Sequence, residues 1–267
     1  MKYAIIVSRK DEAGMNIASN LLKHHEFEEK DSSWVNGNIS LYYANEDSIY
    51  CEGIDKTIDA DIIIFATKHQ SAAGVNSLST HVPGNWGKAE VGGEEGKLCV
   101  APASLLKEMF IELNRRAADF TGDVTLEATH HGPLIDKPCM FIEIGSCLEH
   151  WKTPEYGKII ADTIMAVLQR ERKEYPAVVA LGGQHYPSQL NKVLLKTEYA
   201  ISHICPKYAL PYLDEDMINQ AIEKTLEKVD FILLDWKGLG IEKARVKGLL
   251  EKLNLKNKRI KEILPRE

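Results

Sequence analysis

The stretch Ile62-Ile63-Ile64-Phe65-Ala66-Thr67-Lys68-His69 decides the fold class of this chain. Its first five residues are continuously apolar, which is typical of a strand buried on both faces of a parallel sheet. Further strand-like runs are Tyr3–Ser8, Asp123–Thr129, Cys139–Gly145, Ala177–Gly182, Tyr199–Cys205 and Asp230–Asp235. Helical patterns lie between several of them, at Ala13–His24, Pro102–Ala118, Thr153–Arg172, Asp214–Lys228 and Glu242–Leu253. This alternation predicts an α/β fold with a mixed, largely parallel sheet flanked by helices.

The chain has 267 residues, a length that suits one large domain or two small ones. It shows no internal repeat and no low-complexity linker, so we expect a single α/β domain over residues 1–267. Residues 70–97 differ from the rest because they are rich in Gly, Ser, Asn and His and lack periodicity. A stretch of this length and composition predicts an irregular, functional loop.

Charge is unevenly distributed along the chain. The formal net charge is −6, whereas the segment 237–267 contains ten Lys and Arg residues and four Glu residues. This basic C-terminal segment could form a phosphate-contacting surface or simply a solvated helix face, and the sequence supports both interpretations. No apolar run approaches the roughly 18 residues of a membrane span, and the first residues do not resemble a signal peptide. We therefore expect a cytoplasmic protein, a monomer without an obligate protein partner.

Two adjacent histidines, His130 and His131, stand where a strand-like run ends in Gly132-Pro133. A regular strand would point these two rings to opposite faces. The Gly-Pro turn can break that alternation, which would allow both rings to converge on one cavity. Glu127 shares a face with His131 and could orient it as a supporting carboxylate.

Other ionisable residues occupy similar places near strand ends. Glu143 interrupts an apolar strand, where burial of a carboxylate is costly unless it meets a metal ion, a cation or several donors. The histidines at such places are His69, His81, His185 and His203. A single one would be read as a hydrogen-bonded structural residue, but several together predict at least one bound metal ion. Zinc is the default for imidazole and carboxylate ligands, and the number of histidines allows two ions.

Several common enzyme motifs are absent from the sequence. It contains no Gly-x-Ser-x-Gly elbow, no His-Glu-x-x-His, no Gly-x-Gly-x-x-Gly and no P-loop. The five cysteines form no Cys-x-x-Cys pair, which argues against a disulfide framework and a structural zinc finger. Nucleotide hydrolysis and hydride transfer are therefore not supported.

A set of short motifs resembles the D-aminoacyl-tRNA deacylase family of the archaeal and plant type. The motifs are Ala128-Thr129-His130-His131-Gly132-Pro133, Phe141-Ile142-Glu143-Ile144-Gly145-Ser146, Leu181-Gly182-Gly183-Gln184-His185-Tyr186 and His203-Ile204-Cys205-Pro206-Lys207-Tyr208. The resemblance extends over almost the full chain. It implies a fold similar to nucleoside phosphorylases and peptidyl-tRNA hydrolases, and a cytosolic zinc-dependent esterase that removes D-amino acids from tRNA.

With this resemblance, we expect zinc-activated water to cleave the ester at the acceptor end of D-aminoacyl-tRNA. The expected metal ligands are His130, His131, His185, His203 and Glu143. The expected catalytic residues are His130, Glu143 and Glu127. The expected substrate-binding residues are Lys68, His69, His81, Gly182, Gly183 and Lys207, with the two glycines supplying amides for the oxyanion. Two alternatives stay open: a zinc peptidase or amidohydrolase, and a non-catalytic RNA-binding module.

Overall fold

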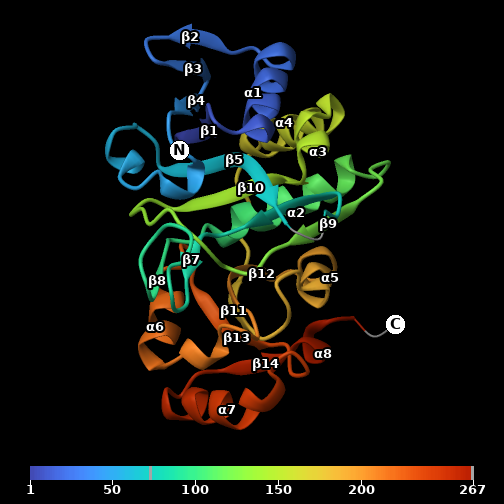
Figure 1. The fold of residues 1–267 in the computed structure, drawn as a ribbon. Coiled ribbons are helices and arrows are strands. Elements are labelled where there is room, and N and C mark those ends of the chain that lie inside the picture. The colour runs from blue at the N-terminus through green and yellow to red at the C-terminus, as the bar shows by residue number, and fades with distance from the viewer. Residues whose placement is uncertain (72–73, 266–267) are drawn as a thin grey trace.

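The computed structural model describes residues 1–71 and 74–265 of the chain. Its strands form an eight-stranded sheet of order β2-β3-β4-β1-β5-β10-β6-β9, a four-stranded sheet of order β12-β11-β13-β14 and the two-stranded ribbon β7-β8. Figure 1 shows the large sheet in one half of the molecule and the small sheet in the other. The expected α/β class is confirmed, but the expectation of one sheet is wrong, because the strands divide between two.

The large sheet is built mainly from parallel pairs. Its strands are β1 (Tyr3–Ser8), β2 (Glu28–Lys30), β3 (Ser33–Asn36), β4 (Ile39–Ala44), β5 (Ile62–Gln70), β6 (Ser77–His81), β9 (Asp123–Leu126) and β10 (Cys139–Ser146). Strand β1 pairs in parallel with β4 and β5, β5 with β10, and β6 with β9. Strand β6 runs antiparallel to β10, and β2, β3 and β4 form an antiparallel meander.

The small sheet is entirely parallel. It contains β11 (Ala177–Leu181), β12 (Ala200–Cys205), β13 (Val229–Leu234) and β14 (Asn257–Arg259), and the separate ribbon contains β7 (Gly84–Asn85) and β8 (Lys97–Leu98). The two sheets are joined just after β9. There the Ala128 amide donates to the His185 carbonyl at 2.8 Å and the Thr129 amide to the Ile204 carbonyl at 3.0 Å. The Glu127 amide still donates to the Thr80 carbonyl of β6 at 3.1 Å, so the chain leaves the large sheet at Ala128.

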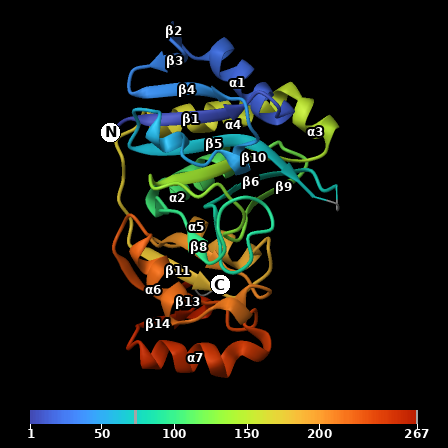
Figure 2. The ribbon, with the colours of Figure 1, turned by 60° about the vertical axis from the view of Figure 1, so that its left-hand side comes forward.

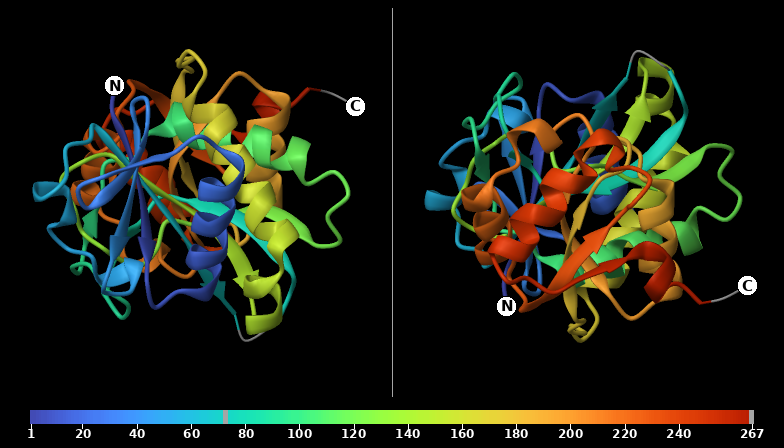
Figure 3. Two further views of the ribbon diagram at one scale, coloured as in Figure 1. Left: turned by 90° about the horizontal axis from the view of Figure 1, so that it is seen from above. Right: turned by 90° about the horizontal axis from the view of Figure 1, so that it is seen from below.

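Helices cover the sheets and the space between them (Figures 2 and 3). They are α1 (Glu12–His24), α2 (Ala103–Arg116), α3 (Leu148–Lys152), α4 (Pro154–Leu168), α5 (Ser188–Lys196), α6 (Glu215–Glu223), α7 (Lys243–Lys252) and α8 (Ile260–Ile263). Helices α1 and α4 pack together on one face of the large sheet, and α2 contacts both β6 and β12. One hydrophobic core cluster runs from Ile5 in the large sheet to Val178 in the small one, and a second cluster, which includes Leu181 and Leu234, packs the other face of the small sheet. The single domain over residues 1–267 stays a prediction.

The opposite face of the large sheet is closed by short segments instead of long helices. The apolar side chains there include Ile6, Phe65 and Phe141. They are covered by Ile135 and by the 3₁₀ turns η1 (Ser48–Tyr50) and η2 (Ile54–Lys56).

The region 70–97 is more ordered than the sequence predicted. It contains β6, whose five residues are all buried, and both strands of the β7-β8 ribbon. Within the basic C-terminal segment, α7, β14 and α8 pack on the small sheet, while Arg266 and Glu267 lie outside the described residues. None of the helices in residues 1–71 and 74–265 has the length and apolar character needed to span a bilayer.

Candidate metal centre and active site

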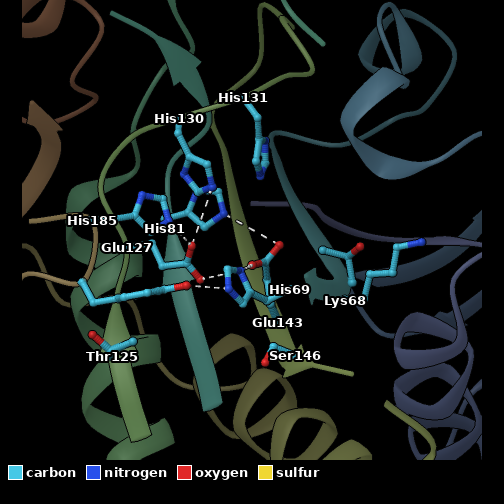
Figure 4. Close-up of polar contacts among 12 residues, drawn as sticks. Lys68, His69, His81, Thr125, Glu127, His130, His131, Glu143, Ser146 and His185 are labelled. Carbon is cyan, nitrogen blue, oxygen red and sulfur yellow. Dashed lines mark hydrogen bonds and ion pairs between the residues drawn. The ribbon is translucent and has the colours of Figure 1, made fainter. Parts of the chain in front are cut away.

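Seven histidine and glutamate side chains from five segments meet where the two sheets join (Figure 4). We call them the His/Glu cluster: His69, His81, Glu127, His130, His131, Glu143 and His185. His69 comes from β5, His81 from the end of β6 and Glu143 from β10. Glu127, His130 and His131 follow β9, and His185 follows β11. The cluster therefore lies near strand ends, as the sequence predicted.

The two adjacent histidines do converge. Their ring centroids are 4.2 Å apart, and His131 has a φ of 48°. This left-handed backbone interrupts the strand alternation at the position where the Gly-Pro turn begins. His81 lies beside both rings, with its centroid 4.5 Å from that of His130 and 4.8 Å from that of His131.

Three overlapping groups in the His/Glu cluster have the composition of metal sites. In each group the ligand atoms lie within 4.8 Å of one another. The groups are His81, His130 and His131; Glu127, His130 and His185; and His69, Glu127 and Glu143. Because His130 and Glu127 each belong to two groups, the geometry suits one ion or two neighbouring ions.

Hydrogen bonding leaves metal-binding atoms available in the cluster. Nδ1 of His130 donates to the Ala128 carbonyl at 2.8 Å, and Nδ1 of His131 donates to the Gly132 carbonyl. A carbonyl oxygen can only accept, so Nε2 of each of these rings carries the lone pair that a metal requires. Both ring nitrogens of His81 are buried and form no hydrogen bond with any described residue. Such orphaned buried nitrogens are costly unless a further group binds them.

The carboxylates tie the cluster together. Glu127 Oε2 accepts from His185 Nε2 at 2.9 Å, and its Oε1 lies 3.1 Å from His69 Nδ1. Glu143 Oε2 lies 3.4 Å from the same His69 nitrogen. Both carboxylates are buried, and their contacts with the imidazole nitrogens of His185 and His69 offset part of the cost of burial.

Burial and neighbouring charges shift the acidity of these groups. Burial and the neighbouring imidazoles lower the pKa of His130 far below its usual value and that of His131 to about 4. Burial acts to raise the pKa of Glu127, but the hydrogen bond from His185 and the nearby His81 and His130 outweigh it and lower this pKa to about 2. Neutral imidazoles next to ionised carboxylates are the protonation states that a divalent metal ion needs.

His69 and His81 lie inside the cluster and not at a separate substrate surface. His69 also reaches outward, because its Nε2 lies 2.7 Å from the hydroxyl of Tyr186. Burial acts to lower the pKa of His69, but Glu143 and Glu127 raise it to about 8. His69 therefore connects the buried carboxylates of Glu127 and Glu143 to Tyr186 at the surface.

His203, which was expected to be a metal ligand, does not join the cluster. Its Nε2 contacts the Lys224 carbonyl at 3.1 Å, and it belongs to none of the three groups. The physical reason is its place in the strand. His203 lies two residues before the end of β12, packed between layers, whereas His185 lies beyond the end of β11.

Gly182 does not supply an oxyanion donor. Its amide donates to the Cys205 carbonyl at 2.8 Å. Its φ of 98° and the Asp235 carbonyl, only 2.8 Å from where a Cβ would lie, show that this glycine allows close packing of the chain. The Gly183 carbonyl accepts from the Lys207 amide at 2.8 Å, and both residues line a neighbouring cavity of about 380 Å³. These residues therefore lie beside the cluster and not within it.

An open cavity of about 900 Å³, which we call the central cavity, gives access to the cluster. It is lined by His69, His130, His131, Glu143 and His185, and also by Asp11, Lys68 and Tyr186. Lys68 thus remains a candidate for substrate binding, 3.9 Å from Asp47 through its ammonium group. The aromatic residues Tyr186 and Tyr208 were missed, although each stands within a motif that the sequence analysis quoted.

Known proteins resemble this chain over most of its length. A profile of the family described as "D-aminoacyl-tRNA deacylase" matches residues 56–258, about three quarters of the chain. The chain belongs to the D-aminoacyl-tRNA deacylase family. This part of the chain contains every member of the His/Glu cluster.

Relatives in the D-aminoacyl-tRNA deacylase family match over most of their length. A protein of that name from Thermococcus onnurineus (strain NA1) is 38% identical, over 94% of this chain and 97% of its own. One from Pyrococcus furiosus is 37% identical with the same coverage. The crystal structure of a conserved protein of unknown function superposes with a TM-score of 0.91 at 28% identity, over 98% of this chain and 96% of that one. The whole architecture is therefore shared with a solved protein.

Proposed function

We propose that this chain hydrolyses the ester that joins a D-amino acid to the 3′-terminal ribose of tRNA, releasing the free amino acid and tRNA. Family membership supports this reaction. The observation that carries it is the buried His/Glu cluster beside an open cavity of about 900 Å³. A cavity of this size admits the aminoacylated end of a nucleic acid and leaves the rest of the tRNA on the surface.

We propose that His81, His130 and His131 hold a zinc ion, since their buried nitrogens fit that ion best. Glu127 and His185, or Glu143 and His69, would complete this site or form a second one. When bound, zinc supplies a Lewis acid that lowers the pKa of water towards neutrality and polarises a carbonyl. Burial lowers the pKa of His130 and of His131, so these two imidazoles are neutral at physiological pH and ready to act as ligands.

The carboxylates are suited to proton transfer. Glu127 is ionised and held by His185, so its Oε2 can accept a proton from a water molecule as the water oxygen bonds to the ester carbon. When the bond between that carbon and the ribose oxygen breaks, the same carboxyl group gives the proton to that oxygen, which becomes the free ribose hydroxyl. Glu143 keeps His69 in place, and Lys68 at the edge of the cavity offers a positive charge to an RNA phosphate.

The experiment that tests the function measures hydrolysis of D-tyrosyl-tRNA, L-tyrosyl-tRNA and a dipeptide by the same preparation. We expect fast hydrolysis of the D-ester, loss of activity with a chelator and recovery with zinc. His130→Ala should abolish the reaction without unfolding the protein. The matched control is His24→Ala, since His24 is exposed on α1 and far from the cluster in sequence. Faster cleavage of the dipeptide, or normal turnover by His130→Ala, would reject the proposal.

A further inference from the structure

A second cavity adjoins the central cavity, and three large aromatic residues are among those that line it, beside the charged Lys88 and Glu90. It has a volume of about 330 Å³, and we call it the aromatic pocket. Trp86, Tyr208 and Tyr212 line it, and it shares His130 and His131 with the central cavity. The catalytic step assigned above uses none of the three aromatic residues.

We propose that the aromatic pocket binds the 3′-terminal nucleobase of tRNA by stacking it on Tyr208. This inference rests on the proposed function, because it names how that substrate is held. It makes Tyr208 a positioning residue for the ester, whose ribose would then lie over the shared histidines.

Tyr208 connects the pocket to the His/Glu cluster. Its hydroxyl lies 3.2 Å from Nδ1 of His185, and the two rings are nearly parallel with centroids 6.4 Å apart. The residue is nevertheless 58% exposed, among the most exposed of the large apolar side chains. A ring fixed through its hydroxyl and open on its surface can accept a flat partner without losing much conformational freedom.

The other two aromatic residues, Trp86 and Tyr212, form walls of the pocket. Trp86 is buried, and its indole N–H donates to the Ile204 carbonyl at 3.0 Å. Tyr212 packs against the backbone of Gly87, where a Cβ would lie only 2.4 Å from the tyrosine ring. Gly87 therefore allows the segment beyond Trp86 to lie flat on Tyr212. Lys88, exposed at the same pocket, can meet the phosphate next to the terminal nucleotide.

The chemistry of the substrate favours a nucleobase over an amino acid side chain here. In the substrate, one ribose carries both the ester and the terminal base, so a site for the base must adjoin the site of hydrolysis. Every tRNA ends in the same nucleotide, whereas the amino acid varies. A fixed aromatic platform suits the constant partner, because every base presents a flat π face.

The test compares D-tyrosyl-tRNA that ends in adenosine with the same tRNA ending in a base-free ribose. For the wild type, we expect loss of the base to lower kcat/KM by roughly 5- to 100-fold, the range of one base–aromatic stack. Tyr208→Ala should lower kcat/KM on the normal tRNA by a similar factor and make the enzyme nearly indifferent to loss of the base, as a double-mutant cycle requires. Tyr208→Phe keeps the aromatic ring, so it should still hydrolyse the tRNA that ends in adenosine faster than the tRNA that ends in a base-free ribose. Leu195→Ala, an exposed residue on α5, is the control.

A binding measurement separates stacking from catalysis. Uncharged tRNA carrying 2-aminopurine in place of the terminal adenine should lose fluorescence on binding to the wild type and to Tyr208→Phe, but not to Tyr208→Ala. If the wild type hydrolyses neither charged tRNA, the proposed function fails. If it hydrolyses both equally, or if Tyr208→Ala keeps the full preference, only the inference about the aromatic pocket is overturned. If Tyr208→Ala changes the relative kcat/KM for different D-amino acids, while loss of the terminal base has no effect on kcat/KM, the pocket binds the amino acid side chain instead.

Discussion

Nε2 of His81 lies 3.8 Å from Oε1 of Glu143, and both side chains are buried. This separation is too long for a hydrogen bond and leaves room for a cation to approach both atoms. The two residues come from neighbouring antiparallel strands, in which His81 pairs with Phe141 and Glu143 pairs with Ser79. Strand β6 thus brings an imidazole to a carboxylate that would otherwise be a costly buried charge.

His81→Gln tests the metal ligand set. We expect it to weaken zinc binding by at least about 100-fold, since loss of a supporting group alone costs 10- to 100-fold. Zinc content after dialysis against a buffered zinc solution gives the measurement. His24→Ala serves as the comparison and should retain the full amount. Equal zinc content in the two variants would exclude His81 as a ligand.

Zinc removal should also lower thermal stability. An ion present at 100 times its Kd stabilises the folded state by about 2.7 kcal/mol, which corresponds to several degrees in Tm for a chain of this size. Melting curves with chelator, and again after zinc is added back, measure the difference. His81→Gln should melt at a temperature that zinc does not change. If neither the chelator nor added zinc changes the Tm of the wild type, the prediction of a bound zinc ion is wrong.

Glu127→Gln tests the proposed proton acceptor. The amide cannot take up a proton, so kcat should fall by about 10²- to 10⁴-fold while KM changes little. Steady-state kinetics on D-tyrosyl-tRNA measure this split. Glu26→Gln, at an exposed position, is the control. A change confined to KM would show that Glu127 serves substrate binding and not proton transfer.

Asp11 links a helix cap to the active site. Its carboxylate accepts from the amides of Gly14 and Lys68, both at 2.9 Å, and from the hydroxyl of Thr67. We expect Asp11→Ala to cost about 1–3 kcal/mol of stability and, because Lys68 and the adjacent His69 lose their support, to lower kcat/KM by about tenfold or more.

The matched control for Asp11 is Asp214→Ala. Asp214 caps α6 through the Met217 amide at 2.8 Å and lies outside the central cavity. It should lose about 1 kcal/mol of stability with unchanged kcat/KM. Denaturant unfolding and kinetics on both variants provide the comparison. Equal kinetic losses would mean that Asp11 acts only through global stability.

Glu112 should make the protein sensitive to acid. Burial acts to raise its pKa, but hydrogen bonds from Arg115, Arg170 and Arg116 outweigh this effect and lower the pKa to about 2. The resulting stabilisation is complete above the unfolded-state pKa of about 4.5, and it is lost as the pH falls towards 2. It amounts to about 2–3 kcal/mol at neutral pH.

Glu112→Gln should therefore be less stable than the wild type at pH 7 and nearly equal to it at pH 2. Denaturant unfolding across this pH range measures the difference. Glu223→Gln, on the exposed part of α6, should follow the wild type throughout. A difference that persists unchanged at pH 2 would mean that packing, and not ionisation, explains the role of Glu112.

Apolar strands made most of the fold predictable. The continuous run Ile62–Ala66 and its counterparts correspond to observed strands, because burial on both faces leaves a clear pattern. Strand β6 was missed because Ser77, Ser79 and Thr80 give it a polar sequence although it is buried. The division into two sheets was missed because it depends on the hydrogen bonds of Ala128 and Thr129, which no sequence pattern encodes.

The site was predictable where residues follow strands. His130, His131, Glu127, Glu143 and His185 do lie together, although their individual roles stay predictions. The places of His69, His81 and His203 depend on which strands become neighbours. That arrangement follows from the antiparallel insertion of β6 and from the separate small sheet, so residue spacing alone could not assign them.

Because the active site lies where the two sheets join, it needs residues from both sheets, and the residues of the small sheet are synthesised last. A ribosome that has completed β10 has made six of the seven cluster residues, but His185 follows β11 and Tyr208 follows β12. The nascent chain is therefore incompetent until its last third has been made. We therefore expect a fragment that ends before His185 to lack hydrolytic activity, because its cluster is incomplete.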